Sequence, residues 1–193
     1  MAGRPRLFDP NTALEEAMKL FWLNGYEATG LQSLLKKMGI GYQSLYNTYG
    51  NKHSLYLEAL RRYDEWTRGR LKDVLEAPGS PLEHIHQVMK SWVSRAGDPG
   101  YIGCFISVSV AELAIHDEEV AEITRRHLSG VESMFRAALK RASDAGELTT
   151  DLSSRELARF LVHSVRGLEV LAKAGMGSAV IEDVVKVVLS VVK

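Results

Sequence analysis

The fold is decided by residues 39–60, which read GIGYQSLYNTYGNKHSLYLEAL. Residues 42–49 lie between glycines and have helical spacing, so that Leu45 and Tyr49, four positions apart, share one face. The opposite face carries short amide and hydroxyl side chains, those of Gln43, Ser44 and Asn47. Such groups hydrogen-bond base edges in the major groove, where a good bidentate contact contributes about 1–3 kcal/mol of discrimination. The pattern indicates a helix that packs on one side and contacts DNA on the other, although a short polar helix in any bundle could also show it.

Two further helices, the second of them short, are predicted before this one. Asp9 and Pro10 are typical of a helix start, and Gly25 is typical of its end. A second helix follows Thr29 and ends at Gly39, because glycine readily adopts the left-handed conformation that closes a helix. A short turn separates this second helix from the polar one. The order predicts a helix-turn-helix unit.

The rest of the chain also has helical periodicity, and no stretch alternates as a strand does. A helix from about 52 to 75 is followed by Ala-Pro-Gly-Ser-Pro at 77–81, the clearest break in the sequence. Later helices are predicted at about 82–96, 104–111, 117–146, 153–174 and 179–192. We therefore expect an all-α protein with an N-terminal three-helix helix-turn-helix DNA-binding domain, residues 1–51, and a larger helical ligand-binding and dimerisation domain, residues 52–193. The helix at 52–75 is expected to link the two.

Charge is distributed unevenly along the chain. Its 193 residues are 46% hydrophobic, enough for a substantial core, and carry no net charge. Residues 1–62, however, contain eight Lys or Arg and five Asp or Glu. The remaining 131 residues contain sixteen Lys or Arg and nineteen Asp or Glu. The resulting charges, +3 and −3, have the signs expected of a phosphate-facing module on an acidic body.

Several other classes of protein are disfavoured. No apolar run reaches the roughly 18 residues of a membrane helix, and the sequence around Arg4 and Arg6 lacks a signal-peptide stretch, so we expect a cytoplasmic protein without a membrane partner. The single cysteine, Cys104, can form neither an internal disulfide nor a structural zinc site, and no metal or cofactor is expected. There is no phosphate-binding glycine loop or dinucleotide fingerprint, and His84 and His86 lack the spacing of paired metal ligands on a helix. We do not expect an enzyme.

From Phe21 to Leu60 the sequence resembles the N-terminal domain of TetR/AcrR-family regulators. In that family the segment runs approximately Gly-Val-Ser, three variable residues, Leu-Tyr, two variable residues, an aromatic residue, and then Lys ahead of Leu. The matching residues are Gly39, Leu45, Tyr46, Tyr49, Lys52 and Leu55, with Ile40 in place of Val. Two departures stand out: Gly41 replaces the usual Ser and loses a side-chain cap, and Leu35 stands where Ala is common, which could alter how the two helices pack.

The resemblance implies a transcriptional regulator and assigns roles to individual residues. Gln43, Ser44 and Asn47 become candidates for base contacts, and Tyr46 and Lys52 for phosphate contacts. Gln32 would add a contact from the preceding helix, and Tyr42 and Thr29 are further candidates for phosphate contacts. The predicted DNA-binding residues are therefore Thr29, Gln32, Tyr42, Gln43, Ser44, Tyr46, Asn47 and Lys52.

The C-terminal part is similar to one subgroup of the family through Gly103-Cys104, Glu112-Leu113 and His116-Asp117. The resemblance implies a dimeric repressor that binds double-stranded operator DNA and is released by a small-molecule effector. An activator, or an interaction module without small-molecule induction, is the alternative. The residues predicted to line an effector pocket are Trp66, Met89, Trp92, Cys104, Phe105, Ser107, Met134, Phe135 and His163. Each of these is also a residue type that builds helical cores, and the apolar setting of Cys104 disfavours a redox-sensor role.

The resemblance also implies a homodimer in which the last two long helices pair with their twins. The valine-rich final helix independently favours this, because it offers more apolar surface than one short terminal helix normally buries. The predicted interface residues are Leu161, Val165, Leu168, Ile181, Val184 and Val188. Packing of these residues onto the chain's own core is the alternative.

Overall fold

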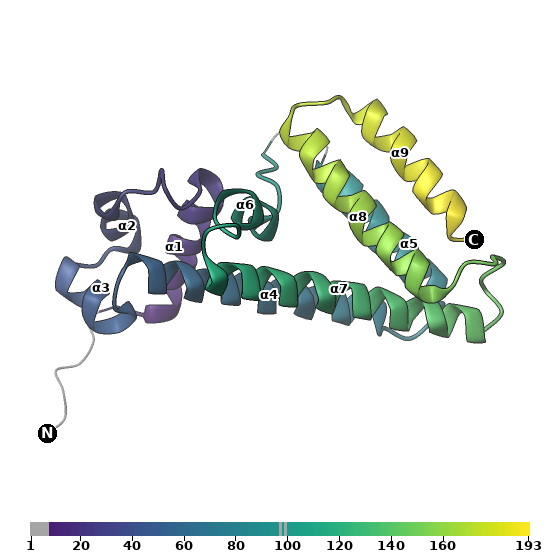
Figure 1. Cartoon of the computed structure of the whole chain (residues 1–193), viewed down its shortest axis with the longest axis horizontal. Helices are drawn as coiled ribbons and strands as arrows, with labels where there is room; N and C mark the ends of the chain where they lie inside the picture. Colours follow the sequence, from purple (N-terminus) through teal and green to yellow (C-terminus); the bar gives the residue numbers. More distant parts are fainter. Residues whose placement is uncertain (1–7, 97, 99) are drawn as a thin grey trace, which may run out of the picture. The chain divides into compact units, whose positions relative to one another are not determined.

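The computed structural model describes residues 8–96, 98 and 100–193, so Arg4 and Arg6 lie outside the described residues. All regular structure in the described part is helical, which confirms the all-α class (Figure 1). The helices are α1 Pro10–Asn24, α2 Leu31–Met38, α3 Tyr42–Tyr49, α4 Lys52–Leu75, α5 Pro81–Ala96, α6 Phe105–Glu112, α7 Glu118–Asp144, α8 Ser154–Lys173 and α9 Ser178–Val191. None of these helices is both long and apolar enough to cross a membrane.

Local capping signals set several helix ends where the sequence predicts them. The Asp9 carboxylate accepts hydrogen bonds from the first backbone N–H groups of α1, and Pro10 occupies the first helical position. The Gly39 backbone is left-handed, with φ of 67°, and closes α2. Ser153 and Glu156 form a reciprocal capping box at the start of α8. These ends are therefore determined by residues close by in the sequence.

The chain packs as two compact units. Unit 1 comprises the described residues up to Glu65 together with Val108–Thr124, and unit 2 comprises those of Trp66–Ser107 together with Arg125–Lys193. The boundaries fall inside α4, α6 and α7, so each of these helices contributes to both units. Residues 8–51 of the proposed DNA-binding domain thus pack in a larger unit with the first part of α4 and the α6–α7 corner, a name used here for residues 108–117.

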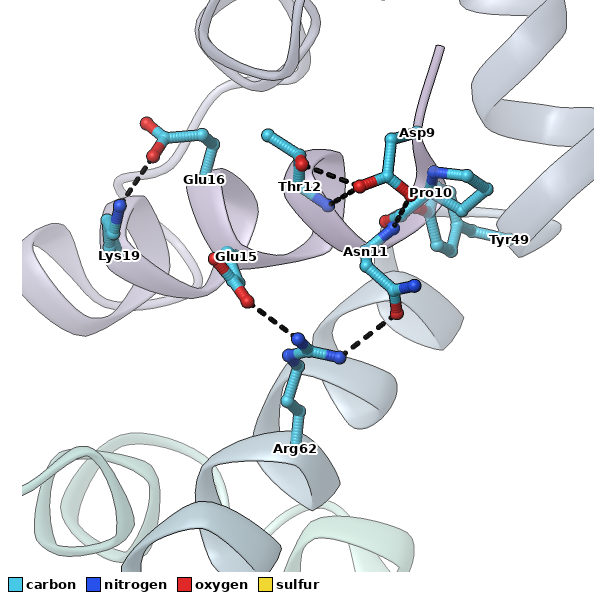
Figure 2. Close-up of polar contacts among 9 residues, drawn as sticks. All are labelled: Asp9, Pro10, Asn11, Thr12, Glu15, Glu16, Lys19, Tyr49 and Arg62. Carbon is cyan, nitrogen blue, oxygen red and sulfur yellow. Dashed lines mark hydrogen bonds and ion pairs between the residues drawn. The ribbon is translucent and has the colours of Figure 1, made fainter. Parts of the chain in front are cut away.

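Hydrogen bonds at the start of α1 join it to α3 and α4 (Figure 2). The Tyr49 hydroxyl, from α3, donates to the Pro10 carbonyl at 2.8 Å. The Arg62 guanidinium, from α4, donates to Asn11 at 3.2 Å and to Glu15 at 2.6 Å. Beneath these contacts the ring of Phe21 meets that of Tyr56 edge-on, with centroids 5.0 Å apart, and both side chains are fully buried. The buried side of α3 is thereby fixed to the start of α1.

Unit 2 is built around α5, α8 and α9, which pack against one another (Figure 1). Their apolar faces, with residues of α4 and α7, form one core that includes Leu75, Ile85, Met89, Phe135 and Leu161. A smaller cluster of Leu168, Ile181 and Val185 joins the end of α8 to the start of α9. The buried apolar residues of this half of the chain thus pack against one another within their own unit.

Candidate nucleic-acid interface

Helix α3 carries four stripes of side chains, because residues four apart lie nearly above one another on a helix. Leu45 and Tyr49 form a buried stripe that packs into unit 1. The amide stripe, Gln43 and Asn47, lies on the opposite side and both side chains are exposed. The remaining stripes are those of Tyr42 with Tyr46 and of Ser44 with Thr48. The helix thus presents hydrogen-bonding groups outward from a fixed apolar base.

The amide stripe is internally connected. Gln43 Nε2 donates to Asn47 Oδ1 at 2.9 Å. This bond leaves the Gln43 side-chain carbonyl and the Asn47 side-chain amino group to face a ligand. Together these two groups offer one acceptor and two donors. Adenine presents the complementary N6 donor and N7 acceptor in the major groove. Ser44, the third candidate for a base contact, is half-buried beside this pair.

The tyrosine stripe flanks the amides. The rings of Tyr42 and Tyr46 lie 4.5 Å apart, and both side chains are more than a third exposed. A hydrogen bond with Tyr46 raises the pKa of Tyr42, which links the two hydroxyls. Neutral phenol hydroxyls can donate to phosphate oxygens. The structure thus places both predicted phosphate contacts beside the predicted base contacts.

Lys52, the first residue of α4, lies near the α1–α2 turn. Its Nζ is 4.2 Å from the ring centroid of Tyr26, within range of a cation–π interaction. This contact restricts a flexible side chain while leaving its charge intact. Gln32 is exposed and is the second residue of α2, the helix before α3. The charge and the extra amide therefore come from the two elements next to α3 in the sequence.

Thr29 lies differently from the other predicted DNA contacts. Its side chain is only 1% exposed, and its hydroxyl donates to the Gly25 carbonyl at 2.6 Å. It closes the turn ahead of α2, whose cap is Gly30. This burial argues against the predicted phosphate contact, and we leave Thr29 out of the proposed interface.

Comparisons with known proteins agree with this geometry. A family model described as bacterial regulatory proteins, tetR family, matches residues 13–59, and one described as tetracyclin repressor-like, C-terminal domain, matches residues 81–187. The uncharacterized HTH-type transcriptional regulator YezE of Bacillus subtilis is 39% identical over 98% of both chains. The chain belongs to the TetR family of transcriptional regulators. Since this is a family of regulators and not of enzymes, the expectation of a non-enzyme is confirmed.

Two further relatives of this TetR-family regulator have described functions. The HTH-type transcriptional repressor ComR of Escherichia coli is 28% identical, over 90% of this chain and 83% of its own. The TetR-family regulator CifR was solved as a cysteine mutant complexed with 26-base-pair double-strand operator DNA. It superposes with a TM-score of 0.85 at 31% identity, covering 99% of this chain and all of that one.

The residues predicted to line an effector pocket in this TetR-family regulator separate into groups. Met89 and Phe135 are fully buried in the core of unit 2, and Trp92 and Met134 pack against that core partly exposed. Cys104 and Phe105 are buried around the start of α6. Trp66, which is 44% exposed, and His163 lie on the surface. The structure thus brings four of the nine residues, from α5 and α7, into one cluster.

Ser107, the ninth predicted pocket residue, belongs to a half-buried polar cluster in unit 2 whose other members were not predicted from the sequence. The Arg166 guanidinium donates to the Glu169 carboxylate at 2.8 Å, and the Ser107 hydroxyl donates to the same oxygen at 2.9 Å. Nearby, burial raises the pKa of Tyr101 well above its usual range, and the negative charge of Glu169 adds to that rise. We call Tyr101, Ser107, Arg166 and Glu169 the Ser107 cluster. Arg and Glu three apart on a helix usually indicate a solvated pair, so sequence spacing alone does not reveal it.

The predicted dimer residues of this regulator lie mostly inside their own chain. Leu161, Val165, Leu168, Ile181 and Val188 are at most 4% exposed, so packing onto the chain's own core accounts for them. Val184 alone among the six is exposed. The large apolar residues that α8 and α9 leave exposed are Phe160, Val170, Val180, Val184 and Val187. We call this set the outer α8–α9 face.

Proposed function

We propose that this protein is a repressor that binds operator DNA through α3 and is released by a small-molecule effector. The observation that carries the proposal is the exposed amide stripe of Gln43 and Asn47, held opposite the buried base of α3 and followed by Lys52. Repression is favoured by the similarity to ComR, a repressor, and operator binding by the similarity to CifR. We place this action in the cytoplasm, beside the chromosome.

Selection from a random double-stranded DNA library tests the first part of the proposal. The wild-type protein is expected to enrich one sequence, here called the selected DNA, and to shift it in a gel. The double variant Gln43→Ala/Asn47→Ala should lose this preference, because the groups facing the bases are gone. Gln87→Ala, at an exposed amide of α5, is the matched control and should bind as the wild type does. A reporter gene placed under the selected DNA should be silenced by the protein; increased expression would indicate an activator.

We further propose that the protein acts as a twofold dimer through the outer α8–α9 face. Two helix-turn-helix units bind successive major grooves about 34–36 Å apart, which requires two copies of α3. An exposed set of five apolar side chains on two adjacent helices is suited to a second copy of itself, because a twofold interface uses the same patch on both subunits. Light scattering should give a mass of two chains.

The proposed effector site lies in unit 2. Ligand pockets combine an apolar lining with a few polar groups that fix orientation. We propose that the aromatic and methionine side chains around Phe135 form the apolar lining and that the Ser107 cluster supplies the polar groups. The effector class that this favours is a largely apolar molecule with a hydrogen-bonding group. Native mass spectrometry of the purified protein would identify such a molecule if it is retained.

Coupling between effector and DNA is proposed to pass along α4, which extends from Lys52 beside the DNA contacts into unit 2. An effector can shift the equilibrium only by its differential affinity for the two states, typically about 1–3 kcal/mol, and DNA must weaken effector binding by the same factor. Calorimetry with and without selected DNA tests this reciprocity. Equal effector affinities would show that the two sites are uncoupled.

A further inference from the structure

Glu112, the last residue of α6, makes two hydrogen bonds to a distant turn. Its carboxylate accepts from the backbone N–H of Tyr26 at 2.9 Å and from that of Glu27 at 2.8 Å. Both amides belong to the turn that joins α1 to α2. A charged acceptor makes these bonds roughly twice as strong as neutral ones. The turn ahead of α2 is thus closed by a residue more than 80 positions away in the chain.

The same turn leaves space for that carboxylate at Gly25. The backbone there has φ of 81°, and a Cβ at this position would lie 2.6 Å from Glu112 Oε2. On its other side the Gly25 carbonyl accepts the buried hydroxyl of Thr29. The turn is therefore held from both sides, and any side chain at residue 25 would push the carboxylate away.

Two more contacts join the α6–α7 corner to the start of α4. His53 Nε2 lies 2.6 Å from Asp117 Oδ2, and the Tyr56 hydroxyl is hydrogen-bonded to Ser109 Oγ at 2.8 Å. His53 directly follows Lys52, the proposed phosphate contact. The corner thus contacts the rest of unit 1 at the entry to α2 and at the first turns of α4, on either side of α3 in the sequence.

We infer that Glu112 is a positioning residue for DNA recognition. By fixing the α1–α2 turn it fixes the start of α2, and through α2 the placement of α3 against DNA. A carboxylate in a DNA-binding unit repels phosphates, so on charge alone its removal should strengthen binding. If Glu112 positions the turn, its removal should instead weaken sequence-specific binding. This inference rests on the proposal that α3 contacts bases.

The test compares Glu112→Ala and Glu112→Gln with Glu122→Gln, an exposed position on α7 in the same unit. All three variants remove one negative charge, but only the first two remove turn contacts. We expect the Glu112→Ala variant to lose about tenfold in affinity for selected DNA relative to scrambled DNA, and Glu112→Gln to lose less because it keeps one acceptor. Glu122→Gln should keep the wild-type ratio.

Amide hydrogen exchange provides a second readout that does not need DNA. The amides of Tyr26 and Glu27 should exchange about tenfold faster in Glu112→Ala and stay protected in Glu122→Gln. If Glu112→Ala unfolds unit 1, Glu112→Gln gives the answer in both assays. If the Glu112 variants keep the wild-type ratio of affinities for selected and scrambled DNA, and their Tyr26 and Glu27 amides exchange as in the wild type, the inference is overturned while the proposed function stands. If the wild-type protein selects no sequence, the proposed function fails and this inference fails with it.

Discussion

Gln43 donates its side-chain amide to the side-chain carbonyl of Asn47 across one turn of α3. The bond orients both amides, so the pair presents an acceptor from the first residue and donors from the second. Since neither orientation is fixed without the other, the two residues should contact DNA as one group and not as two independent ones.

The first prediction is that their substitutions are non-additive. Gln43→Ala and Asn47→Ala should each reduce affinity for selected DNA by about 1–3 kcal/mol, and the double variant should cost little more than either single one. Binding isotherms for the three variants and the wild type form the required double-mutant cycle. Additive losses would show that each amide acts alone.

Lys52 provides the second prediction. Lys52→Met keeps the aliphatic stem over Tyr26 but removes the charge, so affinity for selected and scrambled DNA should fall by the same factor. The slope of log affinity against log salt should decrease in magnitude by about 0.9 per protomer, as expected for one lost phosphate contact. Affinity measured at four salt concentrations decides the matter. A loss confined to the selected DNA would instead assign Lys52 to base recognition.

The third prediction separates the two faces of α9. Val187 is 61% exposed and Val188 is 2% exposed, although they are neighbours in the sequence. Val187→Glu should yield monomers that melt as folded chains. Val188→Glu should destabilise unit 2 itself by about 3–5 kcal/mol, because it buries an uncompensated charge. Light scattering with thermal melts distinguishes the two effects, and an intact dimer in Val187→Glu would exclude the outer α8–α9 face as the interface.

The fourth prediction concerns acid stability. Burial alone would raise the pKa of Asp117, but hydrogen bonds from the Val120 backbone and from His53 outweigh it, so the pKa is lowered from 3.8. A carboxylate with a lowered folded-state pKa stabilises the fold above its unfolded pKa and loses that contribution as pH falls through the folded value. The melting temperature of Asp117→Asn should therefore lie below that of the wild type at pH 7, and the gap should narrow below pH 3.8. If the difference in melting temperature does not change with pH, the substitution acts through packing and not through the charge of Asp117. Asp73→Asn, at an exposed position on α4, is the control.

Features that depend on nearby residues are predictable from this sequence. The N-cap at Asp9, the capping box of Ser153 with Glu156 and the exposed amide stripe of α3 all follow from spacings of four residues or fewer. The bonds from Glu112 to the α1–α2 turn do not, because periodicity carries no information about which segments meet across more than 80 residues. The contacts of His53 with Asp117 and of Tyr56 with Ser109 are of this second kind as well.

Burial explains where the site predictions departed from the structure. Apolar periodicity shows that Val184, Val185 and Val188 belong to an apolar helix, but not which side their own unit covers. Here the core of unit 2 takes Val185 and Val188 and leaves Val184 exposed. The sequence likewise does not show that the Thr29 hydroxyl is buried, since a hydroxyl near a helix start can donate to a backbone carbonyl as well as to a ligand.

The discontinuity of unit 1 also matters for how the protein is made. Its second segment, Val108–Thr124, leaves the ribosome only after α5 and the preceding part of unit 2 have been synthesised. Until then the nascent DNA-binding segment lacks the partners of His53, Tyr56 and the α1–α2 turn. Although domains generally fold in order from the N-terminus, this one cannot complete its packing first. A nascent or truncated chain ending near residue 65 would therefore have an incompletely packed DNA-binding unit, without the contacts that residues 108–124 supply.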